Sequence, residues 1–92
     1  MVTKSKLKEL KKESKSLNSI IRIGKNGLTS GLIKEINDHL KKRKLIKVKV
    51  LRSCLDDNTL DIIIMKIMRN CESCILIDKI GGTFSIYRGK FD

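Results

Sequence analysis

The feature that most constrains this chain is a short glycine loop, Gly-Lys-Asn-Gly, at residues 24–27. A β-branched apolar stretch, Ile20–Ile23, precedes the loop and apolar residues at helical spacing follow it, so the chain must turn here between a strand and a helix. Glycine has no Cβ and can adopt positive φ. A glycine turn that carries a lysine can therefore bring backbone N–H groups and a cation close to an anion. The loop predicts a strand–turn–helix unit suited to a phosphate backbone.

The positive charge lies in the same half of the chain. Residues 1–50 hold fifteen Lys or Arg against four Asp or Glu, whereas residues 51–92 hold six of each, and the net charge is +11. Such an excess is typical of a polyanion-binding protein, because each neutralised phosphate releases condensed counterions. Nucleic acid is the first candidate. The alternative is a basic surface that serves solubility or an anionic membrane, and the uneven distribution of charge weighs against it.

The length and composition favour one soluble domain over residues 1–92. With 40% apolar residues, the chain can build one small core but not two. Its longest uncharged apolar run, Ile62–Met65, is far below the roughly 20 residues of a membrane span. The lysine-rich residues 1–15 lack the apolar core of a secretory signal, and the acidic Glu9 and Glu13 are atypical of a transit peptide. We therefore expect a cytoplasmic protein.

Apolar spacing predicts an α/β domain with the element order αβαβαββ. The triplet at residues 62–64 could also start a strand, but the length of the apolar pattern favours a helix there. The Gly-Gly pair at residues 81–82 predicts a hairpin turn. The expected elements are a helix over 3–16, a strand over 20–23, a helix from Thr29 or Ser30 to about 42, a strand over 46–50, a helix after a turn at 56–58 and reaching about 71, and strands over 74–80 and 83–88.

Three motifs give the chain a resemblance to a known family. They are the glycine-loop segment at residues 23–31, the Leu-Ile-Lys-Val-Lys run at 45–49, and the ending Ile-Gly-Gly-Thr-Phe-Ser-Ile-Tyr-Arg at 80–88. In this order they resemble the CRM domain, whose stand-alone prokaryotic members are the ribosome-associated YhbY-like proteins. The chain departs from that pattern at the cysteines flanking residues 72–73 and at Gly89 and Lys90, where we would expect an extended tail.

The resemblance implies a fold and a function. The implied fold is a compact two-layer α/β domain with a mixed four-stranded sheet, similar to the C-terminal domain of bacterial translation initiation factor three. The implied activity is RNA binding through the glycine loop and the neighbouring basic surface. Members of the family are linked to precursors of the large ribosomal subunit and, in plant organelles, to intron splicing.

The candidate RNA-binding residues are glycines, hydrogen-bonding residues and cations in the basic half. We expect Lys25 to contact phosphate and Asn26 to bond phosphate, sugar or an exposed base, although a turn lysine can also be merely solvated. A charge run at the end of a helix is also what the helix dipole favours, and lysines on one strand face can be an ordinary solvated surface. Thr29 is expected to cap a helix first and to contact a ligand second. The full set is Arg22, Gly24, Lys25, Asn26, Gly27, Thr29, Lys41, Lys42, Arg43, Lys44, Lys47 and Lys49.

Aromatic residues are scarce, and this bears on the kind of RNA. Phe84, Tyr87 and Phe91 are the aromatic residues of the chain, all near its end. A stacking platform for single strands needs several aromatics on an open sheet. Structured RNA held by its backbone, with ribosomal RNA or a large-subunit precursor as the expected partner, fits the composition better.

A Cys-x-x-Cys motif at Cys71 and Cys74 raises the alternative of zinc or redox chemistry. A closed zinc site needs four ligands, and Cys54 and His39 do not supply a second ligand pair at the usual spacing. A thioredoxin-like site needs the pair at a helix start, whereas this pair ends a predicted helix. We predict no metal, no cofactor and no catalytic site.

The sequence thus favours a non-enzymatic RNA-binding protein in large-subunit assembly. The rival is a basic adaptor, or a subunit of an RNA-processing complex, that docks on an acidic partner. In that case Leu7, Leu10 and Leu17 would form a partner-facing stripe, whereas we expect these leucines to pack on the domain itself.

Overall fold

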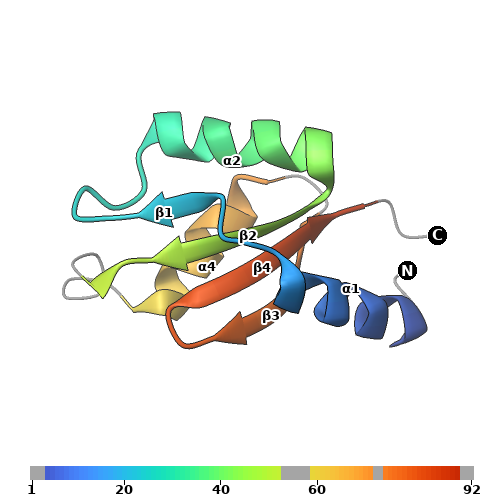
Figure 1. Cartoon of the computed structure of the whole chain (residues 1–92). Coiled ribbons are helices and arrows are strands. Elements are labelled where there is room, and N and C mark those ends of the chain that lie inside the picture. The colour runs from blue at the N-terminus through green and yellow to red at the C-terminus, as the bar shows by residue number, and fades with distance from the viewer. Residues whose placement is uncertain (1–3, 53–58, 72–73, 90–92) are drawn as a thin grey trace.

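The computed structural model describes residues 4–52, 59–71 and 74–89 (Figure 1). The predicted order αβαβαββ is confirmed for these residues, and the turn expected at residues 56–58 lies outside them. The helix expected to reach residue 71 ends at Arg69, because the Asn70 N–H bonds back to the Ile67 carbonyl oxygen and terminates it. The elements are α1 (Lys4–Ser16), β1 (Ile21–Ile23), α2 (Ser30–Arg43), β2 (Leu45–Val50), α4 (Leu60–Arg69), β3 (Cys74–Ile80) and β4 (Thr83–Arg88).

The four strands form the expected mixed sheet in the order β1-β2-β4-β3. Strands β1 and β2 run parallel, while β4 pairs antiparallel with both β2 and β3. The hairpin between β3 and β4 turns at Gly81, whose φ of +59° suits glycine. The two central strands, β2 and β4, therefore join the basic front half of the chain to the neutral back half.

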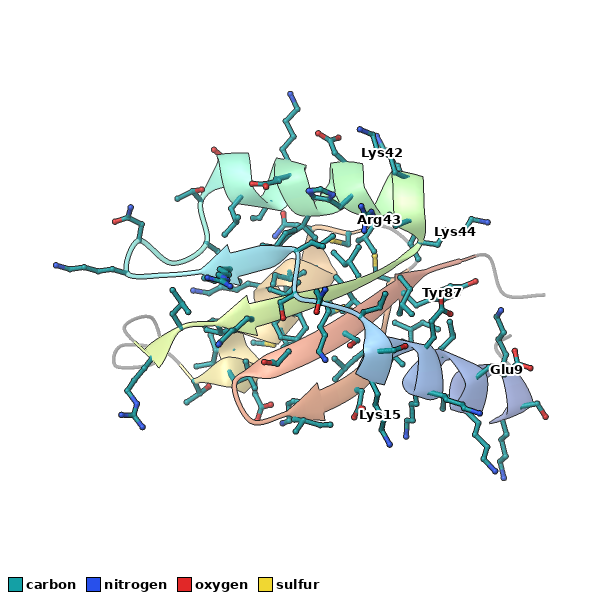
Figure 2. The ribbon with its side chains drawn as sticks, viewed as in Figure 1. Glu9, Lys15, Lys42, Arg43, Lys44 and Tyr87 are labelled. Atoms are coloured by element: carbon teal, nitrogen blue, oxygen red, sulfur yellow. The ribbon has the colours of Figure 1, made fainter. Side chains whose placement is uncertain are left out.

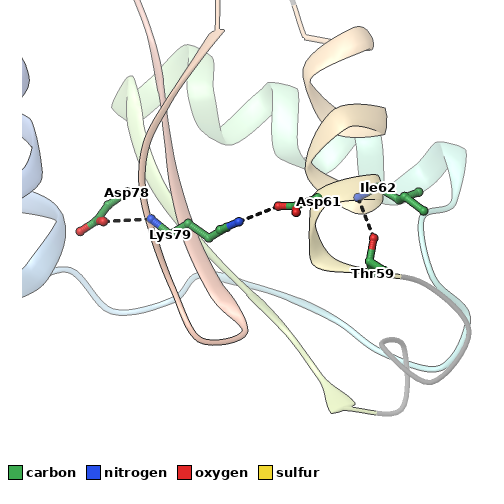
Figure 3. A network of polar contacts seen from close by, with 5 residues as sticks. All are labelled: Thr59, Asp61, Ile62, Asp78 and Lys79. Atoms are coloured by element: carbon green, nitrogen blue, oxygen red, sulfur yellow. Dashed lines mark hydrogen bonds and ion pairs between the residues drawn. The ribbon is translucent and has the colours of Figure 1, made fainter.

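One face of the sheet carries the main core. Alternate residues of β2 and β4 point to this face because side chains in a strand alternate, and Val48, Phe84 and Ile86 are at most 1% exposed. They pack against the apolar stripes of α2 and α4, represented by Ile36 and Ile67. An exposed ion pair, Lys79 Nζ to Asp61 Oδ1 at 2.6 Å, also joins β3 to the start of α4 (Figure 3).

Helix α1 packs on the opposite face of the sheet and covers one end of it (Figure 1). Leu10 is buried against Leu45 and Ile77, and Leu7 and Leu17 pack beside them. The expected two-layer arrangement holds for the sheet with α2 and α4, and α1 adds a partial third layer because its leucine stripe needs an apolar partner. The same packing confirms the expectation that these leucines pack on the domain itself and do not form a partner-facing stripe.

Lys44 adopts an unusual backbone conformation at the end of α2. Its φ is +64°, its N–H donates to the Leu40 carbonyl oxygen at 2.9 Å, and its own carbonyl accepts from the Arg88 N–H at 2.7 Å. Positive φ costs an L-residue about 1 kcal/mol, and glycine avoids most of that cost. Lys44→Gly is therefore expected to raise the free energy of unfolding by about 0.5–1 kcal/mol.

Urea denaturation measures this change, with Lys34→Gly in the exposed interior of α2 as the control. The control variant should lose about 1 kcal/mol, because glycine disfavours a helix interior. A loss of stability in Lys44→Gly would contradict the role assigned to the backbone of Lys44.

Candidate nucleic-acid interface

The glycine loop is a tight turn between β1 and α2. The Gly27 N–H donates to the Gly24 carbonyl oxygen at 2.9 Å, which leaves Lys25 and Asn26 exposed at the tip of the turn. Gly27 has a φ of +66°, so the turn requires a residue that tolerates this conformation. The base of the loop is fixed to the end of β2 because the Leu51 N–H donates to the Ile23 carbonyl oxygen at 2.8 Å. Sheet contacts therefore position an exposed lysine.

Thr29 caps α2 directly after the loop. Its side-chain oxygen accepts a hydrogen bond from the Leu32 N–H at 3.1 Å. The first turn of α2 contains no acidic residue. The remaining unpaired N–H groups and the positive end of the helix dipole favour an anion at this helix start.

Three of the candidate cations lie on the same sheet face, the one that α1 covers only in part. Arg22 pairs with Lys49 in the parallel register of β1 and β2, and Lys47 lies two residues before Lys49 on the same face. Arg22 and Lys49 are exposed, whereas Lys47 is half-buried and its Nζ donates to the Ser14 carbonyl oxygen at 3.3 Å. We call this surface, with Lys25, the loop face. It is defined by Arg22, Lys25, Lys47 and Lys49.

The cluster Lys41–Lys44 lies at the opposite end of α2 from the glycine loop (Figure 2). All four residues are exposed. The helix has 14 residues, and at about 1.5 Å per residue the two groups are about 20 Å apart. The candidate residues thus form two separate basic surfaces, because a helix that follows the loop carries its last turn away from it.

Helix α1 contributes a set of lysines that the sequence interpretation missed. Lys4, Lys8, Lys11 and Lys15 recur at intervals of four, three and four residues, which places them on one flank of the helix. Glu9 falls on another side of α1 than Lys15 (Figure 2). Lys15 borders the same hollow as Lys47 and Lys49, so this flank extends the loop face. The helical spacing of the lysines alone could have revealed it.

The comparison with known families gives a match over almost the whole chain. Residues 2–88 match the model of the CRS1 / YhbY (CRM) domain. The chain belongs to the CRM family. The resemblance predicted from three motifs is thereby confirmed over almost the whole chain.

Individual relatives of this CRM domain are similar over most of their length. The chain is 33% identical over 89 residues to the Probable RNA-binding protein YqeI of Bacillus subtilis, covering 96% of this chain and 88% of that protein. It is 38% identical over 72 residues to an RNA-binding protein of Haemophilus influenzae, covering 78% and 70% respectively. The solution structure of the hypothetical protein SAV1595 from Staphylococcus aureus, proposed to bind RNA, superposes with a TM-score of 0.74 at 30% identity, covering 100% of this chain and 93% of that one.

The two described cysteines of this CRM domain hydrogen-bond to each other. Cys71 is buried and Cys74 is half-buried. Burial raises the pKa of the Cys71 thiol, and burial together with the neighbouring Cys71 raises the pKa of Cys74 to about 12. Within residues 4–52, 59–71 and 74–89, no three His, Cys, Asp or Glu side chains gather into a possible metal site, and no helix is long and apolar enough to cross a membrane. Cys54 lies outside the described residues.

These pKa values predict unreactive thiols. At pH 8 the Cys74 thiol stays protonated, so iodoacetamide should alkylate it far more slowly in the folded protein than in the unfolded chain, where a thiol has a pKa of about 8.5. Because the unfolded state loses this proton first, stability should fall as pH rises from about 9 towards 12.

Mass spectrometry after alkylation, with and without denaturant, checks the first effect. Lysines also titrate at high pH, so the second effect is read as a flatter stability profile in Cys74→Ala than in the unsubstituted protein. Rapid alkylation of Cys74 in the folded protein at pH 8 would contradict the assignment.

Proposed function

We propose that this CRM domain binds structured RNA through the loop face and acts in the assembly of the large ribosomal subunit. The observation that carries the proposal is the fixed turn at Gly24–Gly27, which exposes Lys25 between the start of α2 and β1, the strand in which Arg22 pairs with Lys49 of β2. The names of the Bacillus and Haemophilus relatives support RNA as the partner.

The chemistry of the loop face suits a phosphate backbone. Lys25 and the exposed cations of the sheet supply positive charge, and the α2 start supplies N–H groups and the helix dipole. Backbone contacts of this kind fix the register of an RNA without reading its bases. The strand residues beside Lys47 and Lys49 in β4 are Ser85 and Thr83. Ser85 is 2% exposed, so the hydroxyl that this face offers to a ligand is that of the half-buried Thr83. A polar face of this kind suits a folded RNA better than stacked single-stranded bases.

The proposed role is binding in the cytoplasm, without catalysis, cofactor or metal. The adaptor alternative loses its main feature, since the leucine stripe of α1 packs on the sheet. A basic subunit of an RNA-processing complex would use the same loop face, and the RNA that the protein carries in cells decides between that role and ribosome assembly.

The experiment is sedimentation of a cell lysate containing the tagged protein, followed by sequencing of the RNA that travels with it. At low salt we expect enrichment of large-subunit ribosomal RNA, which falls as salt rises because the contacts are electrostatic. The double variant Lys25→Glu with Gly27→Asp should lose this RNA while remaining folded, because aspartate tolerates the positive φ of Gly27 and no atom lies within 4 Å of the added Cβ.

The control is Lys66→Glu with Met65→Asp, two exposed positions of α4, which changes the net charge by the same amount. The control protein should sediment with RNA as the unsubstituted protein does. Enrichment of transfer or intron RNA would overturn the assembly role but keep RNA binding. Unsubstituted protein at the top of the gradient without RNA would overturn the whole proposal.

A further inference from the structure

A hollow of about 290 Å³ opens on the loop-face side of the sheet, where α1 ends. Its rim carries Lys15 from α1 and Lys47 and Lys49 from β2. Its floor is low because the central strand β4 places the small side chains of Thr83 and Ser85 beneath it. The volume is at the lower end of the ~300–1,000 Å³ typical of small-ligand sites, which suits a single nucleotide.

Asp78 places a negative charge in this hollow, which a site for phosphate alone would not contain. Its side chain lines the hollow on β3, opposite Ser85 in the strand register. Figure 3 shows Asp78 pointing to the other side of β3 from the Lys79 side chain, which reaches Asp61. The Asp78 Oδ1 atom accepts the Lys79 backbone N–H at 2.9 Å. A carboxylate has about four acceptor sites, so Asp78 can also accept hydrogen bonds from a ligand.

A carboxylate repels a phosphate, and its presence among three lysines therefore points to a ligand with both an anionic part and N–H donors. A nucleotide has this combination, since its phosphate is anionic and the Watson–Crick edges of all four bases carry N–H groups. The neighbouring Ile80 is 63% exposed at the edge of the hollow and offers an apolar surface to the face of a base.

We propose that the hollow receives one unpaired nucleotide of the bound RNA, with its phosphate at the lysine rim and its base edge towards Asp78. This inference rests on the proposed function, because the same RNA is held by the loop face. It restricts the RNA ligand to a structured RNA in which an unpaired nucleotide, such as a bulge, lies next to the stretch of phosphate backbone that contacts the loop face. Bases in paired stems cannot enter the hollow, whereas unpaired bases can be turned outward.

The experiment compares two hairpin RNAs by fluorescence anisotropy at one salt concentration. Both have the same paired stem, and one carries a single unpaired nucleotide in it. The unsubstituted protein should prefer the bulged RNA by about tenfold, the value expected for a hydrogen bond to a charged group. Asp78→Asn should reduce that preference several-fold, because the amide oxygen of asparagine is a weaker acceptor than a carboxylate. Binding of the fully paired RNA should stay equal or become tighter, because a negative charge has been removed.

The matched control is Asp38→Asn, an exposed carboxylate on α2 outside the hollow, which removes the same charge. It should affect both RNAs equally and keep the preference. Ser85→Val, which narrows the hollow and suits a strand, should also weaken binding of the bulged RNA, and circular dichroism checks that both variants fold.

Equal affinity of the unsubstituted protein for the two RNAs would overturn the nucleotide site while leaving the proposed function intact. The nucleotide site would also be overturned if Asp78→Asn raised the affinity for both RNAs equally, as is expected of Asp38→Asn. Failure of the unsubstituted protein to bind either RNA would instead overturn the proposed function itself.

Discussion

Replacing Arg22, Lys25 and Lys49 together by glutamate is expected to weaken binding of structured RNA by at least about a hundredfold near physiological salt. All three side chains are exposed on the loop face, and within the described residues none of them forms an intramolecular ion pair. Losing one exposed contact between unit charges costs about 1 kcal/mol, so three contacts amount to about two factors of ten before the added repulsion is counted. The slope of log affinity against log salt should also become shallower.

The structure offers a charge-matched comparison at the other end of α2. Replacing Lys41, Lys42 and Arg43 by glutamate changes the net charge by the same amount but about 20 Å from the glycine loop. Filter binding over a range of salt concentrations should show less than about a tenfold loss for this variant, since only long-range screened repulsion acts. Equal losses of RNA affinity in the two variants would show that the RNA contacts are spread over the whole basic half of the chain. That result would contradict a binding surface localised to the loop face.

Phe84→Ala is expected to cost about 3–5 kcal/mol of unfolding free energy. Phe84 is 1% exposed and lies on central strand β4, where its ring packs with the residues of α2 and α4. Truncation removes a large apolar surface and leaves a cavity that the two helices cannot fill without leaving the sheet. A domain of this size has a total stability of roughly 5–15 kcal/mol, so the substitution would remove a large part of that stability.

Urea denaturation followed by circular dichroism measures this loss. Ile62→Ala is the control, because Ile62 is 39% exposed on α4 and its truncation should change stability by no more than about 0.5 kcal/mol. A Phe84→Ala protein as stable as the control would mean that the face with α2 and α4 is not the main core.

Local signals in the sequence were sufficient to predict the helices and strands and their order along the chain. The Gly-Gly turn and the β-rich runs around it predicted both strands of the hairpin at residues 74–80 and 83–88 with the bounds that the structure has. Thr29 was identified as a cap from its hydroxyl and the apolar pattern after it, and it does cap α2. Such features depend on neighbours within a few residues, which a sequence displays directly.

Which charged residues lie together in space could not be predicted from such local signals. Lys41–Lys44 and Lys25 are close in sequence, yet α2 separates them, whereas Lys15 and Lys49 are 34 positions apart and border one hollow. The position of Asp78 beside those lysines depends on the pairing of β3 with β4 and of β4 with β2. The positive φ of Lys44 also lacked a sequence signal, because glycine is the residue expected in that conformation.

The central position of β4 determines when the sheet can form during synthesis of the protein on the ribosome. β4 lies between β2 and β3, and the Gly82 carbonyl oxygen just before it accepts the Val50 N–H at 2.7 Å. Residues 1–50 emerge first and carry all the net charge, but the strand that completes their sheet is made about 35 residues later, or about 2–7 s at typical translation rates. The loop face therefore reaches its folded geometry only after synthesis of residues 83–88, so tight, shape-dependent RNA binding is delayed until nearly the whole domain has left the exit tunnel.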